Sequence, residues 1–578
     1  MRFGIFINSC VCALVMSVAI APSAVALRQA QGPSGSLVTP LSIDSAPLDT
    51  EPVEESASLS TTVTEPVEGP ASLPVTVTEP VEVASSPQLH STNKARSKTK
   101  AQRYVESISR SESLKSSVLG VLALTEGGDT LASWNSGQRM VPASTMKLIT
   151  TGLAIHRLGP DFKYVTRIGY SGSIKDGILD GDLYIVGGGD PTIASGDMMA
   201  PSRDTLFATW KRALTRAGIH RISGLVIGDG RFFDGPIENE NWAYNDLGTD
   251  FGAGGNGLAR NILTVNVEPT ALKLKVNVVS MSPSLPWLRF RVNAFTSPAG
   301  SGDNLYLFNT DLAPVAELRG SLAIDKGKRK EQCSNKFGAM TCALSFSEFL
   351  RGAGISNGGA ADVDSYGNVR EAEKFSREVS SRPAASPASI RIIASFRSPS
   401  LLEIAKVTND RSDNFYAETL IRMISKTRTG SASYDSCGVV ILRELDSLGV
   451  DGGCGMRMVD GSGLARHNYI SPDFFCRFLK AMSQSRSSAQ YLSTLSVAGG
   501  SRMKNCPDSL RRRVRMKSGS MNGVLCYSGY ILPAGGVSSR GSFSDDTIVF
   551  SIMTNNIVDD SAAVRNFIDA LLVKLCNG

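Results

Sequence analysis

The alternation of hydrophobic and polar residues predicts a β-hairpin at the start of the chain's globular body. Two strand-like runs, 117–126 and 130–136, flank the turn sequence Gly127-Gly128-Asp129. An apolar helix is then predicted to begin at Pro142 and to end before residue 160. The body therefore opens with two strands and one helix.

The far end of the chain carries the same kinds of element in reverse order. Runs 514–521 and 524–532 flank Asn522-Gly523, which is typical of a tight hairpin turn, and 547–554 predicts one more strand. Helical spacing follows in the apolar residues Val564, Phe567, Ile568, Leu571, Leu572 and Leu575. We therefore expect an antiparallel sheet built from both ends of the body, with terminal helices beside it.

The middle of the body has a different character. Residues 165–395 are rich in strand and turn signals, for example in 181–189 and 222–229. We interpret this stretch as an insertion into a domain that is made by residues 104–164 and 396–578.

The first residues have the pattern of an export signal. The basic start Met1-Arg2 precedes a mostly apolar run, 3–20, and Ala-Val-Ala at 24–26 fits the small-x-small cleavage rule. We expect residues 1–26 to be a cleaved signal peptide, the alternative being a retained membrane anchor. No later apolar run reaches about 20 residues, so we expect no stable membrane span after cleavage.

Residues 27–103 have a composition that argues against a packed core. Proline is frequent, large apolar side chains are scarce, and Thr-Glu-Pro-Val-Glu begins at Thr50, Thr64 and Thr78. The segment ends in a stretch, 94–103, with five basic residues and no acid. We expect a disordered tether, while a specific binding arm, or contact of the basic end with an anionic wall polymer, stays open.

The composition argues against several classes of protein. The chain has 578 residues, of which 42% are hydrophobic, enough for a large core divided among several domains. Its four histidines are scattered singly and its cysteines form no C-x-x-C pair, which argues against zinc and haem enzymes. The formal net charge of +6 is modest, and no nucleic-acid partner is expected.

Eight cysteines follow the predicted signal peptide, and an even number in an exported chain permits disulfides. Cys333 with Cys342, and Cys437 with Cys454, are the candidates that close short loops. Reduced cysteines in the core are the alternative.

The first candidate motif is the tetrapeptide Ser-Thr-Met-Lys at 144–147, at the start of the predicted apolar helix. Residues three apart on a helix share a face, so the hydroxyl of Ser144 and the amine of Lys147 can meet. Burial in apolar surroundings lowers the pKa of an amine, which can then take a serine proton. S-x-x-K also occurs at Ser97 and Ser501, so the helix context singles out Ser144.

The second motif is Ser412-Asp413-Asn414, in a polar turn before a predicted helix over 415–426. Similar S-x-N patterns recur in the chain, and helix N-capping by Ser412 or Asp413 is an equally plausible interpretation.

The third motif is Lys517-Ser518-Gly519, within the predicted strand 514–521. Strand alternation places Lys517 and Gly519 on one face, where a glycine would let a substrate backbone approach closely. Several arginines precede the motif, so the local potential favours an anion. A basic, solvated strand is the alternative.

Together, S-x-x-K, S-D-N and a K-T-G-like motif form the signature of penicillin-binding proteins and class A β-lactamases. Here they occur in that order and in helix, loop and strand contexts. The chain therefore resembles the penicillin-recognising serine enzymes over about 104–578. The resemblance implies an α/β fold in which helices flank an antiparallel five-stranded sheet.

The spacing of the motifs narrows the resemblance. Ser144 lies more than twice as far from Ser412 as Ser412 lies from Lys517. Such a long first gap is similar to the low-molecular-mass class C penicillin-binding proteins, the D-alanyl-D-alanine carboxypeptidase/endopeptidases. The stretches 187–192 and 460–464 look like the same branch, which implies two smaller domains inside the insertion.

By this resemblance, Ser144 would attack the carbonyl between the two D-alanines of a peptidoglycan stem peptide. Lys147 would act as general base, and Ser412 would pass the proton to the leaving amine. Asn414 would hold the acyl-side amide. The backbone N–H groups of Ser144 and Ser520 would form the oxyanion hole.

The family likewise implies that Lys517 and Ser518, next to Gly519, bind the terminal carboxylate of the substrate. β-Lactam antibiotics would acylate the same serine, no metal or organic cofactor is needed, and the location would be the periplasm or another extracytoplasmic cell-wall space. The rivals are a serine β-lactamase or esterase of the same fold, or a non-catalytic peptidoglycan-binding scaffold.

Two other patterns carry weaker signals. Residues 252–257 fit G-x-G-x-x-G, but the strand, turn and helix of a dinucleotide site are not predicted around them. Ser462 lies in Asp-Gly-Ser-Gly-Leu, which does not match the nucleophile elbow, and we interpret this stretch as a turn beside the site.

Overall fold

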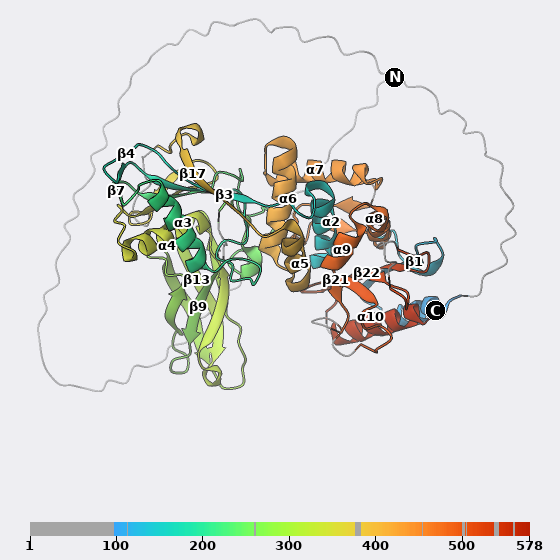
Figure 1. The fold of residues 1–578 in the computed structure, drawn as a ribbon. Helices are drawn as coiled ribbons and strands as arrows, with labels where there is room; N and C mark the ends of the chain where they lie inside the picture. The colour runs from blue at the N-terminus through green and yellow to red at the C-terminus, as the bar shows by residue number, and fades with distance from the viewer. Residues whose placement is uncertain are drawn as a thin grey trace, which may run out of the picture. The chain divides into compact units, whose positions relative to one another are not determined.

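The computed structural model describes residues 98–577 except 113, 259–261, 376–382, 454, 500–502, 504–505, 537–542 and 559–560 (Figure 1). The predicted signal peptide and most of the predicted tether lie outside these residues. Helix α1 (Lys100–Ile108) is capped by Thr99, and its Gln102 accepts a hydrogen bond from the backbone of Ser133. Packed structure therefore begins a few residues before 104.

One antiparallel sheet is built from both ends of the body, as the hydrophobic pattern predicts. Its strand order is β2-β1-β23-β22-β21-β20. The long strands are β1 (Val118–Thr125), β2 (Thr130–Trp134), β21 (Val514–Met521), β22 (Val524–Ile531) and β23 (Ile548–Asn555). A two-residue strand, β20 (Ser496–Val497), joins the edge beside β21 as a sixth member.

The two faces of this sheet carry different cores because successive strand residues point to opposite sides. In β22, Val524, Cys526 and Tyr530 belong to one core, and Leu525, Tyr527 and Ile531 to the other. The second core includes α1 and α10 (Ser561–Cys576), which Figure 1 shows beside the sheet. The helices of the first core include α2 (Lys147–Leu158), α5 (Leu401–Arg411), α6 (Asn414–Thr429), α7 (Tyr434–Ser447) and α8 (Pro472–Gln484).

Helix α2 is the centre of the first core. Residues 147–155 are all buried, which is typical of a helix enclosed by protein on every side. The short helix α9 (Ser488–Thr494) packs beside it, where the Tyr491 hydroxyl donates to the Leu148 carbonyl. The start of α2 is therefore held well inside the protein.

The middle of the chain forms separate sheets. A mixed six-stranded sheet has the order β16-β15-β8-β6-β3-β17. Its strands are β3 (Val165–Tyr170), β6 (Leu183–Val186), β8 (Val226–Asp229), β15 (Ala360–Val363), β16 (Val369–Glu371) and β17 (Arg391–Arg397). Because the first strand of this region, β3, pairs with the last, β17, the chain enters and leaves it at neighbouring positions.

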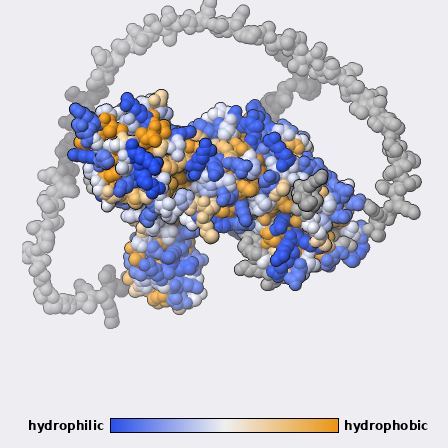
Figure 2. Space-filling model, in the orientation of Figure 1, coloured by the Kyte–Doolittle hydropathy of each residue, from blue (hydrophilic) through white to orange (hydrophobic). Residues whose placement is uncertain are grey.

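The described part of this region also contains two α-helices and three small sheets. The helices are α3 (Arg203–Arg216) and α4 (Gly338–Gly352). The small sheets are β4 (Ser173–Lys175), β5 (Ile178–Asp180) and β7 (Arg221–Ile222); β9 (Ile262–Glu268), β10 (Asn277–Ser282) and β14 (Arg329–Ser334); and β11 (Arg289–Ser297), β12 (Tyr306–Thr310) and β13 (Ala313–Ala323). On the face drawn in Figure 2, mainly hydrophilic residues cover β9 and β13.

The predicted disulfide between Cys333 and Cys342 does not form. All seven described cysteines are free thiols, including both members of the predicted pair Cys333–Cys342. Cys437 is also a free thiol, and its predicted partner Cys454 lies outside the described residues. The described cysteines other than Cys576 are buried, and burial raises the pKa of Cys342 to about 12, so the alternative of reduced core cysteines is correct for these residues.

A buried arginine joins α6 to the middle region. The guanidinium of Arg422 donates to the carbonyls of Asp234 (2.6 Å), Gly255 (2.6 Å) and Pro236 (3.2 Å), and to that of Ala432 (2.9 Å). It also lies over the rings of Phe233 and Tyr434. One side chain thus satisfies four backbone acceptors on three segments.

We expect Arg422→Ala to lower the free energy of unfolding by about 3 kcal/mol, because the truncation leaves these buried carbonyls without their charged donor. The measurement is the urea midpoint followed by circular dichroism. Arg203→Ala is the control, since Arg203 forms an exposed ion pair with Asp204 and such pairs contribute about 0–1 kcal/mol. Equal midpoints for the two variants would contradict the anchoring role of Arg422.

Candidate active site

Ser144 and Lys147 lie on a short turn of helix that leads into α2. Residues Ala143–Met146 form a 3-10 turn, and the α-helix begins at Lys147 rather than at Pro142 as predicted. Residues three apart eclipse each other in 3-10 geometry, so the side chains still meet. The Lys147 amine donates to the Ser144 hydroxyl at 3.0 Å, and Ser144 itself is partly exposed.

The Lys147 amine is fully buried and has three oxygen acceptors. Besides Ser144 Oγ, it donates to Asn414 Oδ1 at 2.6 Å and to the Ser462 carbonyl at 2.8 Å. Burial lowers the pKa of Lys147 to about 8, against the opposing effect of the nearby Glu418 carboxylate. A neutral amine next to a serine hydroxyl is therefore accessible near physiological pH.

The Ser412-Asp413-Asn414 motif covers the turn after α5 and the first residue of α6, and its three residues make different contacts. Asp413 is the N-cap of α6 and accepts from the backbone N–H of Tyr416 at 3.1 Å. The capping interpretation is thus correct for Asp413. Asn414 turns its oxygen to Lys147 and donates its amide N–H to the Phe251 carbonyl at 3.1 Å. Ser412 adopts a left-handed conformation, with φ +61° and ψ +38°.

The third motif lies on β21, as predicted. The Lys517 amine is buried and donates to the Ser412 hydroxyl at 2.9 Å and to the Ser518 carbonyl at 2.7 Å. Ser518 is also largely buried, whereas Ser520 is exposed. The structure therefore contains two serine–lysine pairs, Ser144 with Lys147 and Ser412 with Lys517.

Gly519 brings β21 against the serine turn. A Cβ atom at this position would lie 2.6 Å from the Pro142 carbonyl oxygen, 2.7 Å from Thr145 N and 2.8 Å from Ser144 N. Such distances leave no room for a side chain. The glycine is required here for the approach of the protein's own backbone, a reason different from the substrate approach that the sequence suggests.

Sequence reasoning missed Glu418, a buried acid one turn after Asn414 on α6. Its carboxylate accepts from the backbone N–H groups of Ser462 (2.8 Å) and Gly461 (3.1 Å). Burial raises the pKa of Glu418. The same loop presents the Ser462 carbonyl to Lys147, so Glu418 supports the lysine through the loop. The available signal was a single acid in an otherwise apolar helix stretch.

Asp460 holds the other side of this loop. Its carboxylate accepts from the backbone N–H groups of Gly463 (2.8 Å) and Ala465 (2.7 Å), and from the Trp242 indole at 2.9 Å. The Asp-Gly-Ser-Gly-Leu stretch is therefore a turn beside the site, as predicted, and Ser462 contributes its backbone carbonyl to Lys147.

The glycine-rich stretch 252–257 packs backbone against backbone. It begins in a 3-10 turn (Asp250–Gly252) and precedes strand β9, so the described residues around it, which leave out 259–261, do not form the strand–turn–helix of a dinucleotide site. A Cβ at Gly254 would lie 1.6 Å from the Ile237 carbonyl oxygen, and the Gly255 carbonyl accepts from Arg422. These glycines fit the close packing of the middle region on α6.

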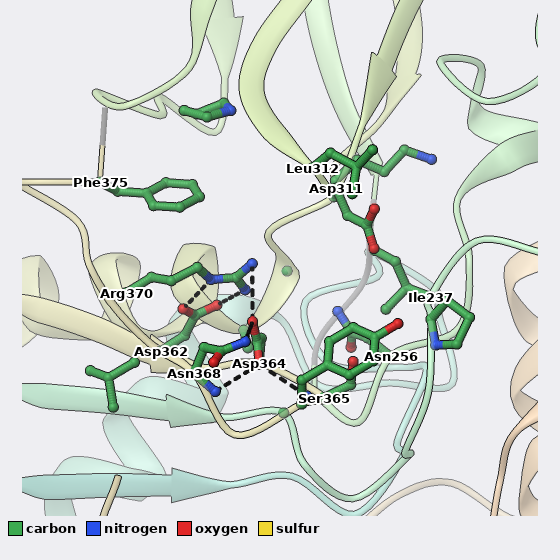
Figure 3. A pocket seen from close by; sticks show the side chains of 18 of the residues that line it. Ile237, Asn256, Asp311, Leu312, Asp362, Asp364, Ser365, Asn368, Arg370 and Phe375 are labelled. Atoms are coloured by element: carbon green, nitrogen blue, oxygen red, sulfur yellow. Dashed lines mark hydrogen bonds and ion pairs between the residues drawn. The ribbon is translucent and has the colours of Figure 1, made fainter. Parts of the chain in front are cut away.

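A cavity of about 750 Å³ lies in the middle region, and its lining includes no residue of the three motifs (Figure 3). Arg370 forms two hydrogen bonds with Asp362, at 2.9 and 2.6 Å. The Asp364 carboxylate accepts from the backbone N–H groups of Tyr366 and Asn368. Much of the charge in this cavity is thus paired within the protein, whereas the serine with an adjacent buried amine, Ser144, lies elsewhere.

Comparison with known proteins finds D-alanyl-D-alanine carboxypeptidases both by family and among individual relatives. The family model of the D-Ala-D-Ala carboxypeptidase 3 (S13) family matches residues 101–576. A D-alanyl-D-alanine carboxypeptidase of Actinomadura sp. is 26% identical over 514 residues, which cover 83% of this chain and 87% of that protein. The D-alanyl-D-alanine carboxypeptidase DacB of Haemophilus influenzae is 24% identical over 426 residues, 70% of this chain and 80% of that protein.

The fold has a counterpart among solved structures. The crystal structure of penicillin binding protein 4 from Haemophilus influenzae superposes with a TM-score of 0.65 and 21% identity, covering 80% of this chain and 97% of that one. At this identity the likeness shows the fold, which agrees with the antiparallel sheet and flanking helices predicted from the motifs.

We expect Gly519→Ala to slow covalent labelling of the protein by a labelled β-lactam by about 100-fold. The added Cβ must push β21 away from the serine turn, and small displacements of reacting groups have effects of this order. The matched control is Gly535→Ala, where a Cβ would meet open space. Acylation within twofold of the unchanged protein in both variants would contradict the close-approach argument.

Proposed function

The chain belongs to the D-Ala-D-Ala carboxypeptidase 3 (S13) family and is a serine-type D-alanyl-D-alanine carboxypeptidase, and from this premise we propose that Ser144 is its nucleophile and Lys147 its general base. The observation that carries the proposal is the 3.0 Å hydrogen bond between the Lys147 amine and the Ser144 hydroxyl. Burial favours the neutral form of this amine. A buried amine in contact with a partly exposed serine is the arrangement that nucleophilic catalysis requires.

In the acylation step, the neutral amine of Lys147 removes the hydroxyl proton as Ser144 Oγ bonds to the carbonyl carbon between the two D-alanines. The resulting oxyanion accepts hydrogen bonds from the backbone N–H groups of Ser144 and Ser520. The C–N bond then breaks as the proton taken up by Lys147 is passed through the Ser412 hydroxyl to the departing D-alanine amine, which returns Lys147 to its neutral form. The contact between Ser412 and the Lys517 amine supports this relay.

We propose that residues of the second and third motifs bind the substrate. Lys517 and Ser518 bind the terminal carboxylate, because a buried cation and a hydroxyl on one strand favour an anion. Asn414 holds the acyl-side amide, and its bonds to Lys147 and the Phe251 carbonyl support a fixed orientation. Water then attacks the acyl-enzyme ester, releasing the shortened peptide and regenerating Ser144.

We also propose that β-lactam antibiotics acylate Ser144. The Haemophilus influenzae penicillin binding protein 4 has been solved in complex with a β-lactam, and it shares the fold of this chain. A β-lactam ring offers a strained amide with a nearby carboxylate, which suits a nucleophilic serine next to strand β21, the strand that carries Lys517. Peptidoglycan stem peptides and β-lactams are thus the proposed partners of one site.

The proposed substrate implies export. We propose that residues 1–26 direct the chain to the periplasm or another extracytoplasmic cell-wall space, and that the residues between 26 and helix α1 form a tether. We also propose that 165–395 is inserted into a catalytic domain that begins with α1 and continues over 396–578. The pairing of β3 with β17 supports the insertion. Among the described residues, no helix has the length and apolar character needed to cross a membrane.

The test is incubation of the purified protein with a labelled penicillin and, separately, with an acyl-D-Ala-D-Ala peptide. We expect stable label on the peptide that contains Ser144 and release of free D-alanine. Ser144→Ala is expected to abolish both, and Lys147→Ala to reduce D-alanine release by at least about 10³-fold. Rapid release of hydrolysed penicillin would instead indicate a β-lactamase, and unchanged D-alanine release in Lys147→Ala would refute the proposed base.

The burial of Lys147 predicts the pH dependence of acylation. Because the neutral amine is the base, kcat/KM is expected to rise with pH through the pKa of Lys147, about 8, and then to level off. The Glu418 carboxylate raises the pKa of Lys147, so Glu418→Gln is expected to move this rise to lower pH.

The control for this prediction is Glu348→Gln, which neutralises an exposed acid on α4. We expect its pH profile to match that of the unchanged protein. A profile that is flat between about pH 6 and about pH 9 would contradict the assignment of Lys147 as the titrating base.

A further inference from the structure

A carboxylate from the middle region reaches the catalytic helices. Asp197 lies in the loop between β6 and α3, and its side chain is only 4% exposed. Its carboxylate accepts from the guanidinium of Arg411 through both oxygens, with Nη2 at 3.0 Å from Oδ2. The hydroxyl of Tyr416 donates to the same Oδ2 atom. Asp197 thus bridges the end of α5 and the first turn of α6.

Arg411 and Tyr416, which both donate to Asp197, lie on either side of Ser412 in the chain. Arg411 immediately precedes Ser412, and Tyr416 lies one helical turn after it. Asp413 links the same two residues, since its carboxylate accepts from the Tyr416 backbone N–H at 3.1 Å and from Arg411 Nη2 at 3.4 Å. The residue before Ser412 and the helix start after it are therefore tied to one buried carboxylate.

Ser412 needs such external support because of its backbone. Its φ of +61° lies in the left-handed region, which residues with a side chain adopt when the surrounding structure dictates it. In this conformation the Ser412 hydroxyl lies 2.9 Å from the Lys517 amine. Relaxation of the turn toward ordinary backbone angles would carry the hydroxyl away from that position.

The loop that carries Asp197 is itself well defined. The Asp197 backbone N–H donates to Ser195 Oγ at 3.2 Å, and its carbonyl accepts from the Ala200 N–H at 2.9 Å. Earlier in the loop, Asp190 Oδ1 accepts from the backbone N–H and the hydroxyl of Thr192 at 2.8 and 2.7 Å. The carboxylate is therefore presented by a locally hydrogen-bonded segment rather than by a loose surface loop.

We propose that Asp197 is a positioning residue for the proton relay: it holds Arg411 and Tyr416, and through them the left-handed turn that aims Ser412 at Lys517. The inference rests on the proposed function, in which Ser412 delivers the proton to the leaving amine. Under this proposal the middle region contributes to the reaction. The carboxylate of Asp197 holds Ser412 in place, and it comes from outside the helices and the strand that carry the three motifs. Asp197 acts on the reaction only through Ser412.

The direct test compares Asp197→Asn with the matched control Asp204→Asn. Both substitutions remove one carboxylate from the same part of the chain, but the Asp204 side chain is 73% exposed on α3. The readouts are kcat and KM for D-alanine release, expressed per site titrated with labelled penicillin, together with the melting temperature. Titration of active sites removes the contribution of any misfolded fraction.

We expect Asp197→Asn to lower kcat by about 10- to 100-fold, with KM within about twofold, because misplacing a catalytic group slows the step rather than substrate binding. Asp197→Glu, which keeps the charge, is expected to recover part of kcat. Asp204→Asn is expected to stay within twofold of the unchanged protein. A value of kcat per titrated site for Asp197→Asn equal to that of Asp204→Asn would overturn the proposal.

Tyr416→Phe supplies a second test if Asp197→Asn does not fold, because it removes one hydroxyl donor and keeps the buried ring. We expect a smaller fall in kcat per titrated site, about 3- to 10-fold, and an unchanged value would overturn the proposal. Failure of the unchanged protein to be labelled at Ser144 would refute the proposed function and the inference with it. Normal labelling and turnover in both variants would refute the inference alone.

Discussion

The burial of the Lys147 amine is the constraint on which the site depends. An ammonium group taken out of water is strongly disfavoured unless hydrogen-bond acceptors surround it. The three acceptors come from the turn before α2, from the start of α6 and from the loop that follows β18 (Met456–Arg457). These segments are far apart in the chain and must converge to within hydrogen-bond distance of one atom. The same burial that demands the acceptors also favours the neutral form of the amine.

Backbone segments can pack this closely against the turn that carries Ser144 only at positions without a side chain. Gly519 lets β21 touch the serine turn, and Gly463 lets the Ser462 loop touch it from another direction, since a Cβ there would lie 1.9 Å from the Ala143 carbonyl oxygen. The loop is in turn held by the carboxylates of Glu418 and Asp460. The reactive turn is thus enclosed by backbone on two sides, which limits the motion of Ser144 and Lys147.

The middle region belongs to this arrangement as well. It supplies the Phe251 carbonyl to Asn414, the Trp242 indole to Asp460 and the carboxylate of Asp197 to Arg411. Arg422 makes the reverse connection, from α6 to carbonyls of the middle region. Polar groups buried at such a junction are disfavoured without partners, so the helices that bear the motifs and the middle region stabilise each other.

The sequence by itself determined the strands of the central sheet, the helices α6 and α10, and the membership of three short motifs in one site. Alternation and helical spacing are local properties, and a motif such as Ser144 with Lys147 needs no distant residue to bring its side chains together. Only the tertiary structure decided which oxygens surround Lys147, why residue 519 has no side chain, that Cys333 and Cys342 stay reduced, and that Glu418 supports the site. Each of these depends on contacts between segments that are distant in the chain. Such contacts arise from packing and from the need to satisfy buried polar groups, and no short stretch of sequence encodes them alone.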